Sequence, residues 1–335
     1  GSKCRSDGLM VELVVSTESW PIRGSFTISR GAKTQADVVL VELSSGEFEG
    51  RGECVPYARY GESCDSVVEQ IESLRQDVQQ GLDRIRLQQR LPAGAARNAL
   101  DCAFWDLQAK MSQRGVWELL DMPAMQALTT AYTLSLDSPE NMHKAALAHA
   151  DRPLLKLKLA GEGDIERVRA VRKGAPKARL IVDANEGWDP AIYRRMVPEF
   201  LKLGVEMIEQ PLPAAEDEAL RSLERPIPIC ADESCHEGES LKDVVGKYDM
   251  VNIKLDKAGG LTEALQLRKV AEAEGLQIMV GCMLATSLAM APAVVLAQGA
   301  AIVDLDGPLL LERDRRPGLR FDRSLVYPPQ PELWS

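Results

Sequence analysis

The sequence predicts an α/β protein that consists of an N-terminal α+β domain followed by a closed barrel of alternating strands and helices. Two changes in the apolar pattern lead to this prediction. Within roughly the first 120 residues a strand-like alternation gives way to helical spacing, and from about residue 127 short apolar segments alternate with amphipathic ones. Repeated succession of strand, helix and strand is typical of parallel pairing.

Residues 9–55 are typical of an antiparallel meander. Gly24, Gly31 and Gly46 lie where such a chain would turn, between segments that alternate apolar and polar residues: VELVVS, GSFTIS and DVVLVELSSGEFEGRGEC. Residues 63–120 instead place apolar residues at helical spacing, as in AARNALDCAFWDLQAKM. A sheet followed by helices predicts a separate α+β domain, to which we assign residues 1–122.

The remainder of the chain offers eight strand candidates: ALTTAYTLSL, PLLKLKLA, ARLIVDANE, VEMIEQPLP, IPICADES, MVNIKLDKAGG, LQIMVGCML and AIVDLDGP. Eight such units in about 180 residues fit a closed (β/α) barrel, to which we assign residues 123–310. An open doubly wound sheet is the alternative, but no G-x-G-x-x-G follows any of these strands. The Pro-rich segment 311–335 is expected to pack back on the first domain.

Composition excludes several classes of protein. The 335 residues are 45% hydrophobic and 27% charged, as in ordinary globular proteins. No apolar run approaches the roughly 20 residues of a membrane span, and the first residues, GSKCRSDG, lack the apolar core of a signal peptide. Seven cysteines without a C-x-x-C pair favour a reduced, cytoplasmic setting. A net charge of -10 argues against nucleic acid as a partner.

Polar residues follow the predicted barrel strands at regular intervals. The carboxyl ends of barrel strands build the active site of such folds. From residue 158 onward the steps between these polar positions are 25, 26, 23 and 22 residues, each equal to one strand and helix. We therefore expect one depth in the barrel for Lys158, Asp183, Glu209, Asp232 and Lys254, with Lys156, Gly281, Cys282, Asp304 and Asp306 beside them.

Three consecutive strands each offer a carboxylate: Asp183, Glu209 and Asp232. One strand-end acid could equally cap a helix or pair with an arginine, but three in succession would repel one another in a partly buried mouth. A hard divalent cation relieves that repulsion, and Mg²⁺ prefers such oxygen ligands. The only histidine near these positions is His236, in a predicted loop, so Mg²⁺ is favoured over zinc.

Lys156 and Lys158 lie two residues apart in an apolar strand, so their side chains share one face. A solvated edge strand is the alternative reading of a lone K-x-K. In a closed ring, however, Lys158 and Lys254 would approach the metal from opposite sides. Burial and mutual repulsion are then expected to lower the lysine pKa values, so that one amine acts as a base on a carbon acid. Lys156 would assist and hydrogen-bond the developing oxyanion.

These motifs resemble the enolase superfamily, and its muconate-lactonizing subgroup in particular. The resemblance implies an α+β capping domain over a (β/α)₇β TIM-type barrel. It also implies Mg²⁺ bound by the three acids and an acid/base pair formed by Lys158 and Lys254. It is carried by K-L-K (156–158), D-A-N (183–185), E-Q-P (209–211), A-D-E-S (231–234) and N-I-K-L-D-K-A-G-G (252–260).

A further motif, V-D-L-D-G-P-L-L-L at 303–311, resembles the D-x-D of the dipeptide epimerases. This likeness implies a 1,1-proton transfer that inverts the C-terminal residue of a dipeptide such as L-Ala-D/L-Glu, from peptidoglycan turnover. Asp304 and Asp306 share a face and would bind the α-ammonium of the substrate. Two solvated acids at a strand end are the alternative.

Further substrate contacts are expected from a loop of the capping domain and from the barrel mouth. The loop IRGSFTISRGAKTQ (22–35) carries Arg23, Arg30 and Lys33, and by the resemblance Lys33 would contact an acidic side chain. Solvation of these cations is the alternative. The dipeptide backbone is expected to contact Thr133 and the segment GCMLATS (281–287), which includes Cys282 and Met283, without a role for the Cys282 thiol.

Two other functions remain open from the sequence. A lyase or cycloisomerase of the same superfamily, of the o-succinylbenzoate synthase or muconate cycloisomerase type, would use the same scaffold but would leave Asp304 and Asp306 without an ammonium to bind. A metal-bound carrier of small acids would bind ligands without exchanging a proton. Homo-oligomers are common in the superfamily, but no apolar stripe in this sequence identifies an interface.

Overall fold

The computed structural model describes residues 10–235 and 238–335, so His236 and the first nine residues lie outside the described part. The chain opens with an antiparallel sheet of order β1-β2-β3, made of β1 (Glu12–Ile28), β2 (Gly31–Ser45) and β3 (Phe48–Cys54). Gly46 supplies the predicted turn between β2 and β3. The predicted turn at Gly24 is wrong, because Gly24 lies inside β1, where the register to β2 shifts.

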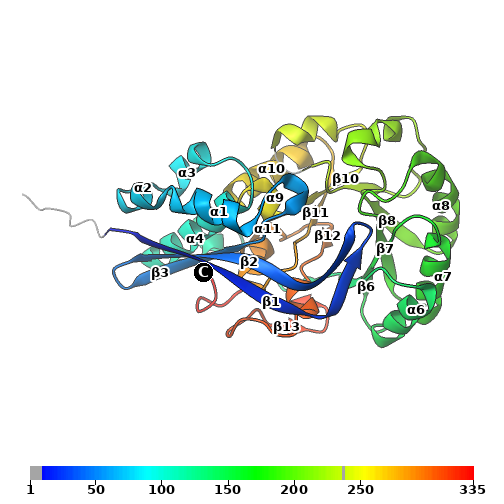
Figure 1. Ribbon diagram of the computed structural model, residues 1–335, viewed down its shortest axis with the longest axis horizontal. Coiled ribbons are helices and arrows are strands. Elements are labelled where there is room, and N and C mark those ends of the chain that lie inside the picture. Colours follow the sequence, from blue (N-terminus) through cyan, green and yellow to red (C-terminus); the bar gives the residue numbers. More distant parts are fainter. Residues whose placement is uncertain (1–9, 236–237) are drawn as a thin grey trace, which may run out of the picture.

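Helices cover one face of this sheet (Figure 1). They are η1 (Ala58–Tyr60), α1 (Cys64–Glu72), α2 (Arg75–Gln79), α3 (Arg84–Arg90), α4 (Ala95–Ser112) and α5 (Val116–Leu119). The central helix α4 lies against β3 at very short range. A Cβ atom on Gly52 would come within 2.0 Å of the carbonyl oxygen of Ala99, so only glycine allows this approach.

The predicted barrel is confirmed, with all eight strand candidates in place. The strands form one sheet of order β12-β11-β10-β9-β8-β7-β6-β5. The Ala131 N–H, next to β5, donates to the Val303 carbonyl of β12 at 2.8 Å and joins the two ends of the sheet. The strands are β5 (Tyr132–Leu134), β6 (Leu154–Lys158), β7 (Arg179–Asp183), β8 (Val205–Glu209), β9 (Ile229–Ala231), β10 (Met250–Ile253), β11 (Gln277–Val280) and β12 (Ile302–Val303).

A helical segment follows each of the first seven barrel strands, and the last strand ends the barrel, which gives the (β/α)₇β order. They are α6 (Pro139–Ala148), α7 (Asp164–Gly174), α8 (Pro190–Lys202), η2 (Ala214–Arg221), η3 (Gly238–Asp243), α9 (Leu255–Ala258) with α10 (Leu261–Ala273), and α11 (Ser287–Leu296). Helices such as α8 are amphipathic and bury one face against the sheet, whereas α9 and α11 are buried along nearly their whole length.

The inside of the barrel is built in rings, with one residue contributed by each strand. The lowest ring is a cluster of buried apolar side chains. We call it the apolar ring; it consists of Ala131, Leu154, Ile181, Met207, Cys230, Met250, Met279 and Ile302. It seals the centre of the barrel, so that the two ends of the barrel are separate environments.

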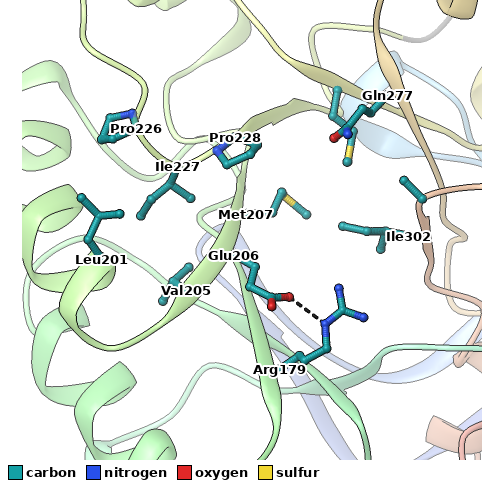
Figure 2. A pocket seen from close by; sticks show the side chains of 12 residues that line it. Arg179, Leu201, Val205, Glu206, Met207, Pro226, Ile227, Pro228, Gln277 and Ile302 are labelled. Carbon is teal, nitrogen blue, oxygen red and sulfur yellow. Dashed lines mark hydrogen bonds and ion pairs between the residues drawn. The ribbon is translucent and has the colours of Figure 1, made fainter.

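At the amino-terminal end of the strands, below the apolar ring, lies a cavity of about 460 Å³ (Figure 2). Nine of its twelve lining residues are apolar, and Arg179 and Glu206, which form an ion pair at 2.8 Å, also line it. None of the predicted site residues lines this cavity. In (β/α) barrels this end serves stability, and the opposite end carries the chemistry.

The C-terminal segment contacts the first domain and also pairs with β4 (Leu128–Thr129). After η4 (Gly307–Leu310), Leu311 pairs with Ile22 of β1. Strands β13 (Phe321–Asp322) and β14 (Leu325–Val326) then pair with β4. Trp334 is fully buried and donates its indole N–H to the Cys102 carbonyl of α4 at 3.0 Å.

No helix in the described part of the chain is long and apolar enough to cross a membrane. The six cysteines of that part are all free, which agrees with the expected lack of a disulfide framework.

We predict that Trp334→Ala lowers the free energy of unfolding by about 3–5 kcal/mol, because it opens a large cavity and leaves the Cys102 carbonyl without its partner. Urea unfolding followed by circular dichroism measures this change. Leu325→Ala is the control on the same segment, since Leu325 is 36% exposed. Equal effects of the two substitutions would contradict a structural role for the buried end of the chain.

Candidate active site

A second ring of inward side chains lies two residues further along each strand, on the same face as the apolar ring. We call it the polar ring. All of its members are buried: Thr133, Lys156, Asp183, Glu209, Asp232, Asn252, Gly281 and Asp304. Two residues further again come Lys158, Lys254 and Asp306. The predicted single depth is therefore wrong in detail, because the three acids lie in the polar ring and Lys158 and Lys254 lie one level further along the strands.

The three predicted metal ligands do converge. Asp183, Glu209 and Asp232 each offer a carboxylate oxygen, and these oxygens lie within 4.8 Å of one another. Burial, and next the charge of Asp183, raise the pKa of Glu209 to about 8. The Oε1 atom of Glu209 accepts no hydrogen bond in the described structure, although the Lys156 Nζ lies 3.1 Å away. A buried all-oxygen donor set with an unsatisfied oxygen fits a hard divalent cation.

Lys156 and Lys158 share a face as predicted, and both ammonium groups contact the same oxygen, Oδ2 of Asp183. The Nζ of Lys158 lies 2.8 Å from it and that of Lys156 lies 3.3 Å from it. Lys156 also lies 2.8 Å from Asp304 and 3.1 Å from Glu209. It therefore neutralises carboxylates from three different strands.

The expected lowering of the lysine pKa values is wrong for Lys156 and Lys254. Burial alone would lower the pKa of Lys156, but the charges of Asp304, Glu209 and Asp183 raise it well above its ordinary value. Lys254 behaves alike, because Asp232 outweighs its burial and raises its pKa. From the sequence these acids are expected beside the lysines, but their charge is assigned to a metal ion. Their attraction for the ammonium groups is therefore not counted in that prediction.

Asp232 is held by two lysines. Lys254 lies 2.8 Å from Oδ2 and Lys257 lies 2.7 Å from Oδ1. Burial would raise the pKa of Asp232, but these two ammonium groups lower it well below its ordinary value. The Nζ of Lys257 also donates to the Cys235 and Asn252 carbonyls. Sequence reasoning missed Lys257, which lies three residues beyond Lys254 in the same motif.

Lys158 and Lys254 lie on opposite sides of the barrel. Lys158 ends β6 and Lys254 follows β10, and in the closed ring four steps separate these strands in either direction. The three acids occupy the strands between them on one arc, while β5, β11 and β12 form the other arc. A small ligand at the centre thus has an amine on each flank.

Asp304 and Asp306 project from the second arc. Asp304 pairs with Lys156, and Asp306 accepts a hydrogen bond from the Thr133 N–H at 2.6 Å. Burial, and next the charge of Asp304, raise the pKa of Asp306 to about 8. The Oδ1 atom of Asp304 is buried without a hydrogen-bond partner. This pair therefore has acceptor capacity left for a cationic group.

The other predicted substrate contacts lie around this pair. Cys282 and Met283 follow β11 and are half-buried at the barrel mouth. Burial, and next the charges of Asp304 and Asp306, raise the pKa of the Cys282 thiol. Thr133 belongs to the polar ring on β5.

The predicted loop 22–35 is not a loop. It is the outer end of the β1–β2 hairpin, which reaches across toward β6 and β7 (Figure 1). Phe26 lies with its ring centre 5.7 Å from the Lys158 Nζ. Lys33 pairs with Phe26 across the hairpin, so both side chains lie on one face, although Lys33 is exposed. Arg23 instead donates to the Leu311 carbonyl.

Polar residues between the ligands fix the loops at the barrel mouth. The Gln210 side chain accepts from the Asp232 N–H and donates to the Tyr248 hydroxyl, so it joins the ends of β8 and β9. Asn252 donates to Glu209 at 3.1 Å. Asn185 and Gln210 have φ values of 45° and 37°, which is a strained conformation at this site. A single sequence shows these residues only as parts of motifs.

Two family comparisons cover most of the chain. Residues 10–121 match the N-terminal domain of the mandelate racemase / muconate lactonizing enzymes, and residues 141–327 match the enolase C-terminal domain-like family.

Characterised relatives agree with these matches. The L-Ala-D/L-Glu epimerase of Escherichia coli K12 is 48% identical over 92% of this chain and 96% of its own length. An N-acetyl-D-glutamate racemase of Pseudoalteromonas is 47% identical over 89% of this chain and 95% of its own length.

Solved structures show the same architecture. An enolase family member from Agrobacterium tumefaciens with homology to dipeptide epimerases is 53% identical, with a TM-score of 0.95 over 97% of this chain and 100% of its own. That structure has bound sodium, L-Ala-L-Glu and an ordered loop. A dipeptide epimerase of Enterococcus faecalis, complexed with Mg and L-Leu-L-Tyr, has a TM-score of 0.89 at 28% identity over 96% of this chain and 98% of its own.

We predict that Mg²⁺ raises the melting temperature of the protein and that Glu209→Gln abolishes most of this rise. A ligand at 100 times its Kd stabilises the folded state by about 2.7 kcal/mol, and the substitution removes one charged ligand. Differential scanning fluorimetry with and without Mg²⁺ measures the shift. Asp217→Asn is the control, because Asp217 is a buried acid paired with Lys247 outside the triad. The same shift in Glu209→Gln as in the control would contradict the metal site.

Proposed function

Because the chain belongs to the enolase superfamily, with its mandelate racemase / muconate lactonizing N-terminal domain, we propose that it is a Mg²⁺-dependent dipeptide epimerase acting on L-Ala-D/L-Glu from peptidoglycan turnover. The observation that carries the proposal is the placement of Lys158 and Lys254 on opposite strands of the barrel, on either side of three converging carboxylates. The reaction inverts the α-carbon of the C-terminal residue.

Asp183, Glu209 and Asp232 hold Mg²⁺ in this proposal. When bound, the ion would supply positive charge beside the substrate carboxylate, where negative charge develops as the α-proton leaves. The contacts of the Lys257 ammonium with four oxygen atoms support this assignment. Two of these oxygens belong to Asp232, so Lys257 fixes the orientation of this proposed ligand before the metal binds.

Lys158 and Lys254 act as the two acid/base groups. One amine takes the α-proton from one face and the other ammonium returns a proton to the opposite face, which inverts the centre. Both ammonium groups contact a proposed metal ligand, at 2.8 Å in each case. Mg²⁺ at those carboxylates would compete for the same negative charge, so metal binding favours release of a lysine proton. Lys156 remains a fixed positive charge that faces the developing oxyanion.

Asp304 and Asp306 bind the α-ammonium of the dipeptide. Two observations support this role. Among the described residues no donor bonds to the Oδ1 atom of Asp304, and burial together with the charge of Asp304 raises the pKa of Asp306 to about 8. A cation between the two carboxylates would offset their repulsion. Thr133 and the segment with Cys282 and Met283 line the path of the dipeptide backbone between these acids and the metal.

The barrel and the cap have different roles in this proposal. We assign the chemistry to the barrel, residues 123–310, and recognition of the substrate side chain to the cap, residues 1–122 completed by 311–335. The position of Lys33 on the same hairpin face as Phe26 supports its role as a contact for an acidic side chain such as glutamate.

A second candidate is racemisation of an N-acylated glutamate, favoured by the relative of 47% identity that acts on N-acetyl-D-glutamate. Such a substrate offers the same carboxylate and α-carbon to the metal and the lysines but carries no ammonium. The lyase and cycloisomerase alternatives share this lack. The paired acids at 304 and 306 favour the dipeptide.

We predict that Lys158→Ala and Lys254→Ala each lower kcat for L-Ala-L-Glu epimerisation by at least about 10³-fold, within the range for a lost general base. In D₂O, each variant should retain α-hydrogen exchange for only the epimer whose proton faces the remaining lysine. Proton NMR measures inversion and exchange together. Lys247→Ala, a buried lysine outside the site, is the control. Full activity in either site variant would exclude the two-base mechanism.

We also predict that Asp306→Asn lowers kcat/KM for L-Ala-L-Glu by about 10²-fold or more, as expected when a buried charge pair is lost. The substitution preserves size and leaves an acceptor for the Thr133 N–H. Turnover of N-acetyl-glutamate, which has no ammonium, should not fall. The ratio of the two kcat/KM values in wild type and variant is the measurement. A parallel loss for both substrates would contradict ammonium binding by this residue.

A further inference from the structure

One side chain connects the tip of the β1–β2 hairpin to the barrel mouth. Arg30 lies in the two-residue turn between the strands. Its Nη1 lies 2.6 Å from the Glu233 Oε2 and donates to the Asn185 carbonyl at 3.0 Å, while Nη2 donates to the Tyr57 hydroxyl. Glu186 lies 3.2 Å from the same Nη1. The guanidinium thus joins the hairpin to the loops after β7 and β9 and to the rest of the cap.

Glu233 is an unusual partner, because it is almost completely buried and lies directly after the proposed metal ligand Asp232. Its side chain is 1% exposed. Arg30 is the residue that forms an ion pair with it among the described residues. Loss of Arg30 would leave a buried carboxylate without its cation, which is far more costly than loss of a surface pair.

The hairpin that Arg30 holds carries residues that face the site. Phe26 lies 5.7 Å from the Lys158 Nζ. On the other side of the turn, Lys33 pairs with Phe26. Further hydrogen bonds attach the same segment: Thr27 N–H to Ser135 Oγ at 2.6 Å, and Leu136 N–H to the Thr27 carbonyl at 2.9 Å. These are single bonds at a rim, whereas Arg30 reaches a buried charge.

We propose that Arg30 is a positioning residue that locks the β1–β2 hairpin onto the barrel mouth through its ion pair with the buried carboxylate of Glu233. The lock keeps Phe26 over Lys158 and Lys33 on the substrate side. Entry and release of substrate then require this pair to break and to form again. The effect on catalysis depends on the function proposed above, but the attachment of the hairpin does not.

Hydrogen exchange tests the attachment in the protein without substrate. In Arg30→Ala we expect the amides of residues 23–33 to exchange at least about tenfold faster than in wild type, the effect of losing a buried charge pair. Arg30→Lys retains the charge but not the planar fork and should fall between the two. Glu233→Gln removes the partner charge, and combining it with Arg30→Ala should add little.

Kinetics with L-Ala-L-Glu test the consequence for catalysis. Arg30→Ala should raise KM about tenfold with a smaller change in kcat, because the hairpin is displaced while the lysines and acids keep their places. Arg59→Ala is the matched control: Arg59 also lies in the cap and pairs with Glu186 at 2.9 Å, but its ion pair does not involve Glu233. It should leave exchange and KM as in wild type.

Unchanged exchange of residues 23–33 in Arg30→Ala would overturn the proposal, as would an equal effect of Arg59→Ala. If Arg30→Ala does not fold, Arg30→Lys and Glu233→Gln decide, and unchanged exchange in both contradicts the lock. A wild-type protein that fails to epimerise dipeptides would refute the proposed function, while the exchange measurement would still decide the role of Arg30.

Discussion

The repulsion among three buried carboxylates is the constraint on which this site depends. Asp183, Glu209 and Asp232 bring their oxygens within 4.8 Å of one another in the interior of the barrel. Such a cluster is stable only with compensating positive charge. In the described structure lysines supply that charge. Asp183 contacts Lys156 and Lys158, and Asp232 contacts Lys254 and Lys257. A divalent ion at the centre would replace part of this compensation and leave the lysines free to exchange protons.

The barrel creates this cluster by a simple periodicity. Parallel strands place every second side chain inside, so each step of two residues from the apolar ring reaches the next level of the site. Apolar side chains at the first level exclude water from below, and charged ones at the second face one another across a short diameter. Gly281 illustrates the limited space, because a Cβ atom there would lie 2.6 Å from the Asn252 Oδ1.

The sequence alone predicts those features that depend on the spacing of apolar and polar residues along the chain. The eight strands, the three acids and the opposed lysines follow from apolar segments and regular steps, and the structure brings these residues together. It could not predict what depends on pairing between distant strands. The direction of the lysine pKa shifts is one example. The acids are expected beside the lysines, but only the fold shows that a contact such as that of Lys156 with Asp304, 148 residues away, outweighs burial. The segment 22–35 is predicted both as part of a meander and as a loop over the substrate, and the structure shows a hairpin whose paired strands reach to the turn at residues 29–30. Lys257 was missed because helical spacing, not strand period, brings it to Asp232.

Chemistry and selectivity therefore come from different parts of the fold. The lysines and the metal ligands lie on rigid strands, where a fixed geometry lowers the reorganisation needed during proton transfer. The residues that we propose to face the substrate side chain lie on a hairpin that crosses from the cap and is attached to the barrel through Thr27, Ser29 and Arg30. In the proposed mechanism, inversion of the α-carbon uses the carboxylate of the substrate, the metal ion and two bases, none of which depends on the N-terminal group of the substrate. In this proposal the acids at 304 and 306 and the cap hairpin therefore set the preference between a dipeptide and an N-acyl amino acid.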